Sequence, residues 1–148
     1  MPTQPVSCGP QSNHFAVVAG YGLPGRSLVE SLSHRGIEYR VIELNPRACQ
    51  RASAGGVNIV IGDASDPAIL REAGVERATL VALMVPSDEV VLRAISQIRA
   101  MNPSVHIIAR CAYTSNGLEA LRRGANQTIV AEQLVAKEIH ELADQFFV

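Results

Sequence analysis

A glycine-rich segment near the N-terminus is the first candidate for chemistry. Residues 20–25 match the pattern G-x-G-x-x-G, between a strand-like apolar run and a helical pattern. This is the context that a phosphate-binding loop requires. Gly20 permits a tight turn, Gly22 lets a pyrophosphate approach the backbone, and Gly25 lets the helix pack closely on the strand. We predict a phosphate site at the helix N-terminus, the alternative being a glycine-rich turn without a ligand.

The second candidate is Glu43, at the end of the next apolar run. Dinucleotide-binding domains carry an acid about twenty residues after the glycine loop, where it holds the adenosine ribose hydroxyls. A carboxylate there repels a 2′-phosphate, so we expect NAD or an adenine nucleotide rather than NADP. Arg47 is close enough in sequence to bind a 2′-phosphate, so NADP remains an alternative ligand. The alternative for Glu43 itself is an ordinary charged residue at a strand end.

A third group, Gly62-Asp63-Ala64, follows another apolar run. The carboxyl ends of parallel strands meet at one edge of a sheet, which is where ligands bind. We expect Asp63 to accept a hydrogen bond from an adenine amino group, the alternative being a role in capping its own loop. Asp66, before Pro67, is predicted to be a helix N-cap.

Six short apolar runs must position these residues. They alternate with helical segments and are rich in β-branched residues, which predicts a Rossmann-like, doubly wound parallel sheet in an α/β domain. The expected strands are residues 15–19, 39–43, 58–61, 79–84, 105–109 and 127–130. Asn45-Pro46 marks a helix start, and Asp88–Met101 carries the apolar stripe of a helix that lies on a sheet.

The last predicted helix, residues 131–146, has one uninterrupted apolar stripe of Val135, Ile139, Leu142 and Phe146. We expect this stripe to pack on the sheet, the alternative being a partner subunit. Residues 1–13 are polar and predict a flexible tail or linker before a nucleotide-binding domain of residues 14–148.

Composition argues against several other classes of protein. A net charge of −1 indicates no nucleic-acid partner. The longest apolar stretch, Ala78 to Val85, is far shorter than a membrane span, so we expect a soluble, cytoplasmic chain. Cys8, Cys49 and Cys111 form no CxxC pair and are expected to be reduced thiols, with redox sensing by one of them as the alternative.

The four histidines show no metal or triad spacing, and His106 is expected to be a structural residue in a core strand. The sequence therefore predicts a nucleotide sensor without catalytic residues, and no metal site. The alternatives are a fragment of an NAD-dependent oxidoreductase and a scaffolding protein with an empty glycine loop.

The order of these segments resembles a known family. Residues 19–22, 41–46, 62–67, 70–75, 107–111 and 121–126 together are similar to the N-terminal domain of regulators of potassium conductance (RCK), also called the TrkA-N or KTN domain. Among such proteins, the chain looks most like the cytosolic domain of Kef-type potassium/proton antiporters. Glu43 stands where many relatives carry aspartate.

The resemblance implies a regulatory domain that binds NAD(H), AMP, ADP or ATP and gates a potassium channel or cation/proton antiporter. It implies a homodimer in the cytoplasm, attached to the membrane-embedded part of such a protein at the inner membrane. We expect a piece of a transporter rather than a stand-alone subunit that docks on one. The residues expected to bind the nucleotide are Gly20, Tyr21, Gly22, Leu23, Pro24, Gly25, Glu43, Leu44, Asn45, Gly62, Asp63, Ala64, Val85, Pro86 and Arg110.

Overall fold

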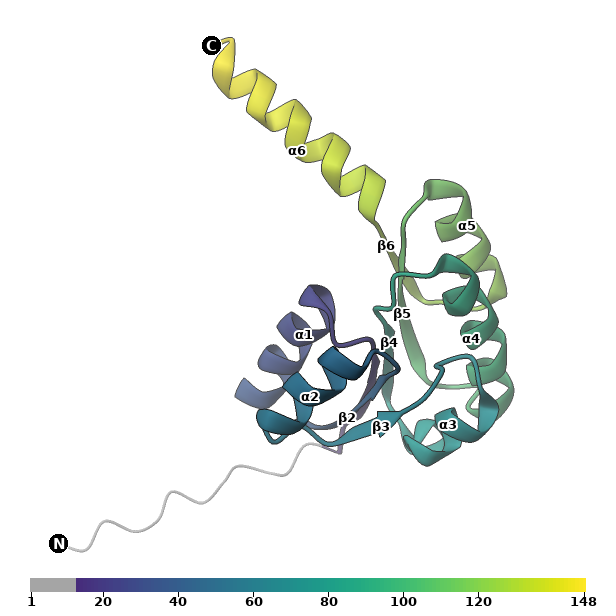
Figure 1. Ribbon diagram of the computed structural model, residues 1–148. Coiled ribbons are helices and arrows are strands. Elements are labelled where there is room, and N and C mark those ends of the chain that lie inside the picture. The colour runs from purple at the N-terminus through teal and green to yellow at the C-terminus, as the bar shows by residue number, and fades with distance from the viewer. Residues whose placement is uncertain (1–12) are drawn as a thin grey trace, which may run out of the picture.

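The computed structural model describes residues 13–148 as an α/β domain built on one parallel sheet (Figure 1). The predicted tail lies outside the described residues, apart from Asn13, as does Cys8. The strands are β1 (Phe15–Ala19), β2 (Glu38–Glu43), β3 (Ile59–Ile61), β4 (Leu80–Leu83), β5 (His106–Cys111) and β6 (Gln127–Val130). The helices are α1 (Leu23–His34), α2 (Pro46–Ala54), α3 (Pro67–Glu72), the short 3₁₀ helix η1 (Val75–Arg77), α4 (Asp88–Met101), α5 (Thr114–Arg123) and α6 (Ala131–Phe146).

The sheet has the order β3-β2-β1-β4-β5-β6, with every neighbouring pair parallel. Helices α1 and α2 cover one face, and α3, α4 and α5 cover the other (Figure 1). Strands β1 and β4 are therefore buried on both sides, and Val17, Val18 and Val81 are fully inaccessible. The predicted doubly wound, six-stranded fold is confirmed. The prediction succeeded because central strands that are buried on both faces require continuous apolar runs.

Helix ends follow the predicted signals. Asn45 Oδ1 accepts hydrogen bonds from the amides of Arg47 and Ala48 at the start of α2. Asp66 caps α3 in the same way, through the amide of Ala68. Within residues 13–148, no helix combines the length and apolarity needed to cross a bilayer.

Strand β5 differs from its prediction. It begins at His106 and runs to Cys111, so it includes Arg110. His106 is not a core residue as expected: its side chain is exposed at the start of the strand, where its Nε2 lies 2.9 Å from Oε1 of Gln127 on β6.

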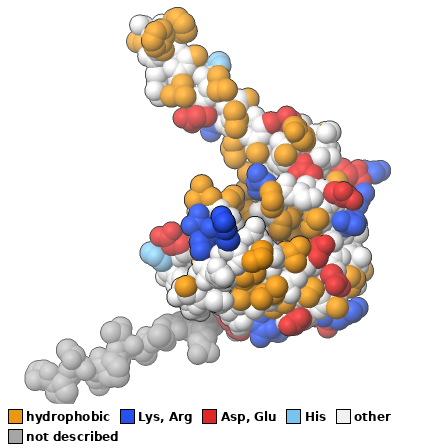
Figure 2. Space-filling view, viewed as in Figure 1, with side chains coloured by type: hydrophobic (Ala, Val, Ile, Leu, Met, Phe, Trp, Pro, Cys, Tyr) orange, Lys and Arg blue, Asp and Glu red, His pale blue; other side chains and the backbone are white. Residues whose placement is uncertain are grey.

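The expected packing of α6 on the sheet is wrong. Helix α6 leaves the domain after β6 and projects away from it (Figure 1), and none of its residues is buried. Val135, Ile139, Leu142 and Phe146 are between 55% and 81% exposed. Figure 2 shows orange side chains along this arm. An apolar stripe predicts that one face needs a cover but does not specify which surface supplies it.

Candidate functional site

The site lies where the strand order reverses. Helices following β1 and β4 lie on opposite faces of the sheet, so a crevice opens at the carboxyl ends of these strands. Backbone bonds hold the strand ends in one row: Gly20 N–H donates to Ile42 O at 2.8 Å, Gly62 N–H to Glu43 O at 3.1 Å, and Met84 N–H to Ala19 O at 2.7 Å. The loops after four strands therefore converge on one place.

The glycine loop has the geometry its spacing predicts. Gly20 has a φ of 101°, and a Cβ there would lie 2.8 Å from the Met84 carbonyl carbon. A Cβ on Gly25 would collide with the Gly20 carbonyl group, so only glycine allows α1 to pack this closely. Gly22 instead faces open space, with nothing within 4 Å of an added Cβ. The first two glycines of the loop thus have separate roles, one in the turn and one at an open surface.

The start of α1 presents open amides. Gly22 is its N-cap, no side chain caps it, and Pro24 occupies the first turn. No hydrogen bond joins the amides of Gly22 or Leu23 to another group within residues 13–148. Because the positive end of the helix dipole lies here, these amides can bind an anion.

Glu43 links the glycine loop to the loop after β2. Its Oε1 accepts a hydrogen bond from Tyr21 N–H at 3.0 Å. Its Oε2 accepts from Leu44 N–H at 2.7 Å and from Asn45 N–H at 3.3 Å. The carboxylate is therefore fixed between the two loops, with both oxygens at the surface of the crevice.

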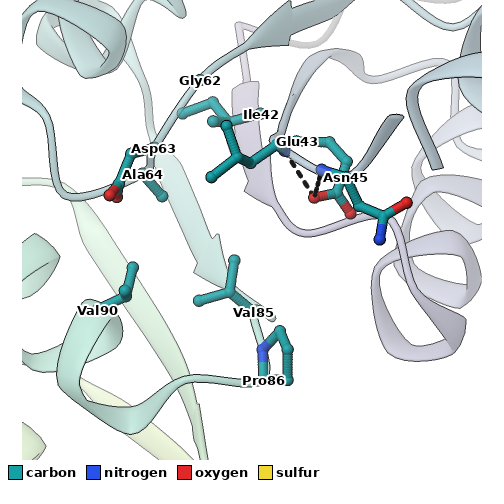
Figure 3. A pocket seen from close by; sticks show the side chains of 10 residues that line it. Ile42, Glu43, Asn45, Gly62, Asp63, Ala64, Val85, Pro86 and Val90 are labelled. Carbon is teal, nitrogen blue, oxygen red and sulfur yellow. Dashed lines mark hydrogen bonds between the residues drawn. The ribbon is translucent and has the colours of Figure 1, made fainter. Parts of the chain in front are cut away.

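One cavity, of about 360 Å³, lies beside Asp63, and we call it the Asp63 cavity (Figure 3). Its lining comprises Ile42, Glu43, Leu44, Asn45, Gly62, Asp63, Ala64, Val85, Pro86 and Val90. Most of this lining is apolar, which suits the flat face of a nucleobase. Asp63 Oδ1 accepts hydrogen bonds from the amide and hydroxyl of Ser65, at 2.8 and 2.7 Å. These bonds, with the more distant charge of Arg93, hold the pKa of Asp63 below its ordinary range. Asp63 thus caps its own loop and also borders the cavity.

A second cavity, of about 380 Å³, adjoins the first at Glu43, Asn45 and Pro86, and we call it the glycine-loop cavity. Its other lining residues are Gly20, Gly22, Pro24, Arg47, Ala48, Arg51, Met84 and Arg110. Arg51 was not anticipated from the sequence, although it follows Arg47 by one helical turn. That spacing was the available signal, but only the orientation of α2 turns both arginines toward the glycine loop.

Three predicted site residues line neither cavity. The Tyr21 side chain packs against the core cluster beneath α1, and only its amide reaches Glu43. Leu23 is 74% exposed, and Gly25 is buried under the loop. The other twelve predicted residues line one cavity or both. Ile42, Ala48, Met84 and Val90 line them too and were not predicted, since apolar residues at strand ends and on helix faces carry no distinguishing signal.

Hydrogen bonds lead from the crevice to α6. Asp88, two residues after Pro86, accepts from Ala112 N–H through both carboxylate oxygens and from the Asn116 side chain. The Ala112 carbonyl accepts from Glu132 N–H at the start of α6. The Glu132 carboxylate accepts from the amide and hydroxyl of Thr114, at 2.6 and 2.7 Å, and so caps α5. The Thr114 hydroxyl and amide lower the pKa of Glu132.

The two described cysteines, Cys49 and Cys111, are free and buried. Burial is the main cause that raises the pKa of both thiols, and the charges of Glu43 and Asp88 raise them further. Within residues 13–148, no group of histidine, cysteine or acidic side chains is arranged to hold a metal ion.

Comparison with known proteins identifies the domain. Residues 16–131 match the family model of the TrkA-N domain. The putative cation/proton antiporter YbaL of Escherichia coli (strain K12) is 33% identical over 132 residues, which are 89% of this chain and 24% of that protein. Potassium channel protein 1 of Methanocaldococcus jannaschii is 24% identical over 89% of this chain and 40% of the channel. The chain thus spans less than half the length of these relatives.

Solved structures agree. The crystal structure of the TrkA-N domain of the E. coli inner membrane protein ybaL has a TM-score of 0.80 at 33% identity, over 88% of this chain and 96% of that domain. The Kef CTD of Shewanella denitrificans, in its AMP-bound form, has a TM-score of 0.73 at 22% identity, over 88% and 80% of the two chains. The GsuK channel bound to NAD has a TM-score of 0.71 at 20% identity, over 78% and 21%. The last two likenesses show the fold alone. With the family model and the ybaL domain in agreement, the chain belongs to the TrkA-N domain family.

Proposed function

We propose that this chain is a regulatory domain that binds NAD(H) or an adenine nucleotide and gates a potassium channel or cation/proton antiporter. One observation carries the binding part: the uncapped N-terminus of α1 opens beside two cavities that meet at Glu43. Proteins similar to this chain are named as antiporters and potassium channels, and structures of the same fold hold AMP or NAD. These names support the regulatory part.

The two cavities suggest one orientation for the nucleotide. The base would enter the apolar Asp63 cavity, where Asp63 Oδ2 accepts no hydrogen bond from another group of residues 13–148. The ribose would lie at Glu43, on the border between the cavities, and the phosphates at the glycine loop. This order assigns the predicted residues Gly20, Gly22, Pro24, Glu43, Asp63 and Arg110 to one bound molecule.

We further propose that the domain binds its nucleotide without converting it. Support comes from the acidic side chains of the crevice, because a general base needs a carboxylate free to take a proton. Both Glu43 oxygens accept backbone amides, and Asp63 accepts two hydrogen bonds from Ser65. Their geometry suits positioning rather than proton transfer.

The proposed partners are a second copy of this chain and a membrane-embedded channel or antiporter domain on whose cytoplasmic side it lies. The exposed stripe of α6 supports the first partner, since burying such apolar side chains is worth about 1.5–3 kcal/mol each. The second follows from the relatives' names, and the proposed unit is residues 14–148.

Replacing Gly22 with valine tests the binding site without disturbing the fold. Gly22 has a φ of −76° and ψ of −167°, an extended conformation that valine adopts readily, and its Cβ would meet no protein atom. A phosphate at the helix start would meet the new side chain instead. We expect calorimetry to show that affinity for NAD or ADP falls at least tenfold, about 1.4 kcal/mol, while the unfolding midpoint is nearly unchanged.

Gly55→Ala is the matched control. Gly55 ends α2 away from the crevice, and its added Cβ would make only an ordinary contact, 3.5 Å from Arg51 O. This variant should bind like the unaltered protein. Equal affinity of Gly22→Val and the unaltered protein for every nucleotide would overturn the assignment of the site.

A further inference from the structure

The glycine-loop cavity carries more positive charge than a single phosphate at the helix start requires. Arg47 and Arg51 reach it from α2 and Arg110 from β5. Its one acidic side chain is Glu43, whose oxygens are occupied by backbone amides. On the face seen in Figure 2, positively charged side chains gather over α1 and α2, and they are arginines because the one lysine of the sequence lies on α6.

Most arginines elsewhere in the domain have protein partners, the exceptions among the described residues being Arg26 on α1 and Arg35 at its end. Each of the following either donates a hydrogen bond to a carbonyl or forms a salt bridge with a carboxylate: Arg40, Arg71, Arg77, Arg93, Arg99, Arg122 and Arg123. Within residues 13–148, no hydrogen bond or salt bridge engages the guanidinium of Arg47, Arg51 or Arg110. Each guanidinium has five N–H donors in a fork that matches phosphate oxygens. Three of the five arginines whose guanidinium has no such partner therefore line this one cavity.

The two helix starts at this cavity differ. The first amides of α2 are already bonded to Asn45, whereas α1 has no side-chain cap. A first phosphate thus has the backbone amides of α1, and the α2 side can add only its side chains. Arg47 and Arg51, one turn apart, share one face of α2.

We propose that Arg47 and Arg51 bind a second phosphate, so that the domain selects nucleotides with a 5′-diphosphate over a nucleoside monophosphate. The preferred ligands are then ADP, ATP, ADP-ribose or a dinucleotide rather than AMP. A 2′-phosphate is a poorer fit, because both arginines share their cavity with Gly20, Gly22 and Pro24, and no arginine lines the Asp63 cavity. The inference rests on the proposed binding of a nucleotide at the glycine loop.

Calorimetry with AMP, ADP, ADP-ribose, NAD and NADP, at one ionic strength, tests the proposal. The protein should bind ADP and ADP-ribose at least tenfold more tightly than AMP. The double variant Arg47→Gln/Arg51→Gln should lose most of this difference, so that the ratio of ADP to AMP affinity falls toward one. A preference for ADP over ADP-ribose, or the reverse, supports the proposal and distinguishes a terminal from a bridging phosphate.

Arg35→Gln is the control variant, and it is compared with the single variants Arg47→Gln and Arg51→Gln. Arg35 follows the far end of α1, is exposed, and lies outside both cavities. It should leave all affinities unchanged, although it removes one positive charge. If the double variant loses AMP and ADP affinity equally, the arginines attract any nucleotide by their charge and do not bind a second phosphate. That result would overturn the proposal.

Three further outcomes of the calorimetry would also test the proposal. If the unaltered protein binds AMP as tightly as ADP, the selection is refuted while nucleotide binding stands. If the double variant weakens NADP far more than ADP, the arginines serve a 2′-phosphate and the proposal fails. If no nucleotide binds at all, the proposed function fails with it.

Discussion

The carboxylate of Glu43 has two roles, one in the candidate nucleotide site and one in the two loops beside it. Its place at the end of a strand predicted a carboxylate near a ribose, and in the structure that carboxylate lines both cavities. The sequence could not reveal that both oxygens already accept the amides of Tyr21, Leu44 and Asn45, because these bonds depend on the approach of two loops. Glu43 therefore holds the two loops together as well as lining both cavities.

Substitutions at Glu43 should separate these two roles. Glu43→Ala leaves three amides without their acceptor and should lower the free energy of unfolding by about 1 kcal/mol, since the amides are partly solvated. It should also weaken NAD and AMP binding and relax the rejection of NADP. Glu43→Gln keeps one acceptor oxygen and removes the charge, so it should relax the rejection of NADP with a smaller loss of stability.

Denaturation with urea measures the first effect and calorimetry the second. Unchanged affinity of both variants for NAD and NADP would show that Glu43 serves only the loops.

The helices and strands that could be predicted from the sequence are those marked by their own residues, through a continuous apolar run or a capping side chain. The central strands were found because both of their faces are covered, and the starts of α2 and α3 were found because Asn45 and Asp66 cap them. The direction of α2, which brings Arg51 to the glycine loop, depends on packing between elements, as does the exposed course of α6. These features were missed because amphipathic patterns define faces and leave their neighbours unspecified.

The junction of α5 and α6 depends on Glu132, which replaces the missing side-chain cap at Tyr113. The lowered pKa of Glu132 means that its carboxylate stabilises the fold above its unfolded pKa, near 4.5, and that this stabilisation is lost as the pH falls through the lowered value. We expect Glu132→Ala to lower the unfolding midpoint at neutral pH and the difference to vanish in strong acid.

Hydrogen exchange at the Thr114 amide should accelerate in Glu132→Ala as well, because that amide loses its acceptor. Glu138→Ala, on the exposed surface of the same helix, makes the same change of residue type without touching Thr114 and should behave like the unaltered protein. A pH-independent deficit in Glu132→Ala would contradict the assigned role of the charge.

At the scale of the whole molecule, the sheet and its five covering helices form a closed body, and α6 stands outside it. We expect light scattering to find a dimer that Ile139→Glu disrupts, because a charge in the middle of the stripe opposes its burial. Lys137→Glu, on the other side of α6, should leave the dimer intact. A concentration-independent monomer, with and without nucleotide, would rule out this role of the helix.

The attachment of α6 has a mechanical consequence. Its side-chain and backbone hydrogen bonds to the rest of residues 13–148 come from Glu132 and Gln133, in its first turn. The 16-residue helix is about 24 Å long, so a tilt of about 10° at this hinge would move its far end by about 4 Å. The first turn of the helix lies a few hydrogen bonds from Pro86, so a tilt at this junction would displace the far end of α6 more than any other part of it.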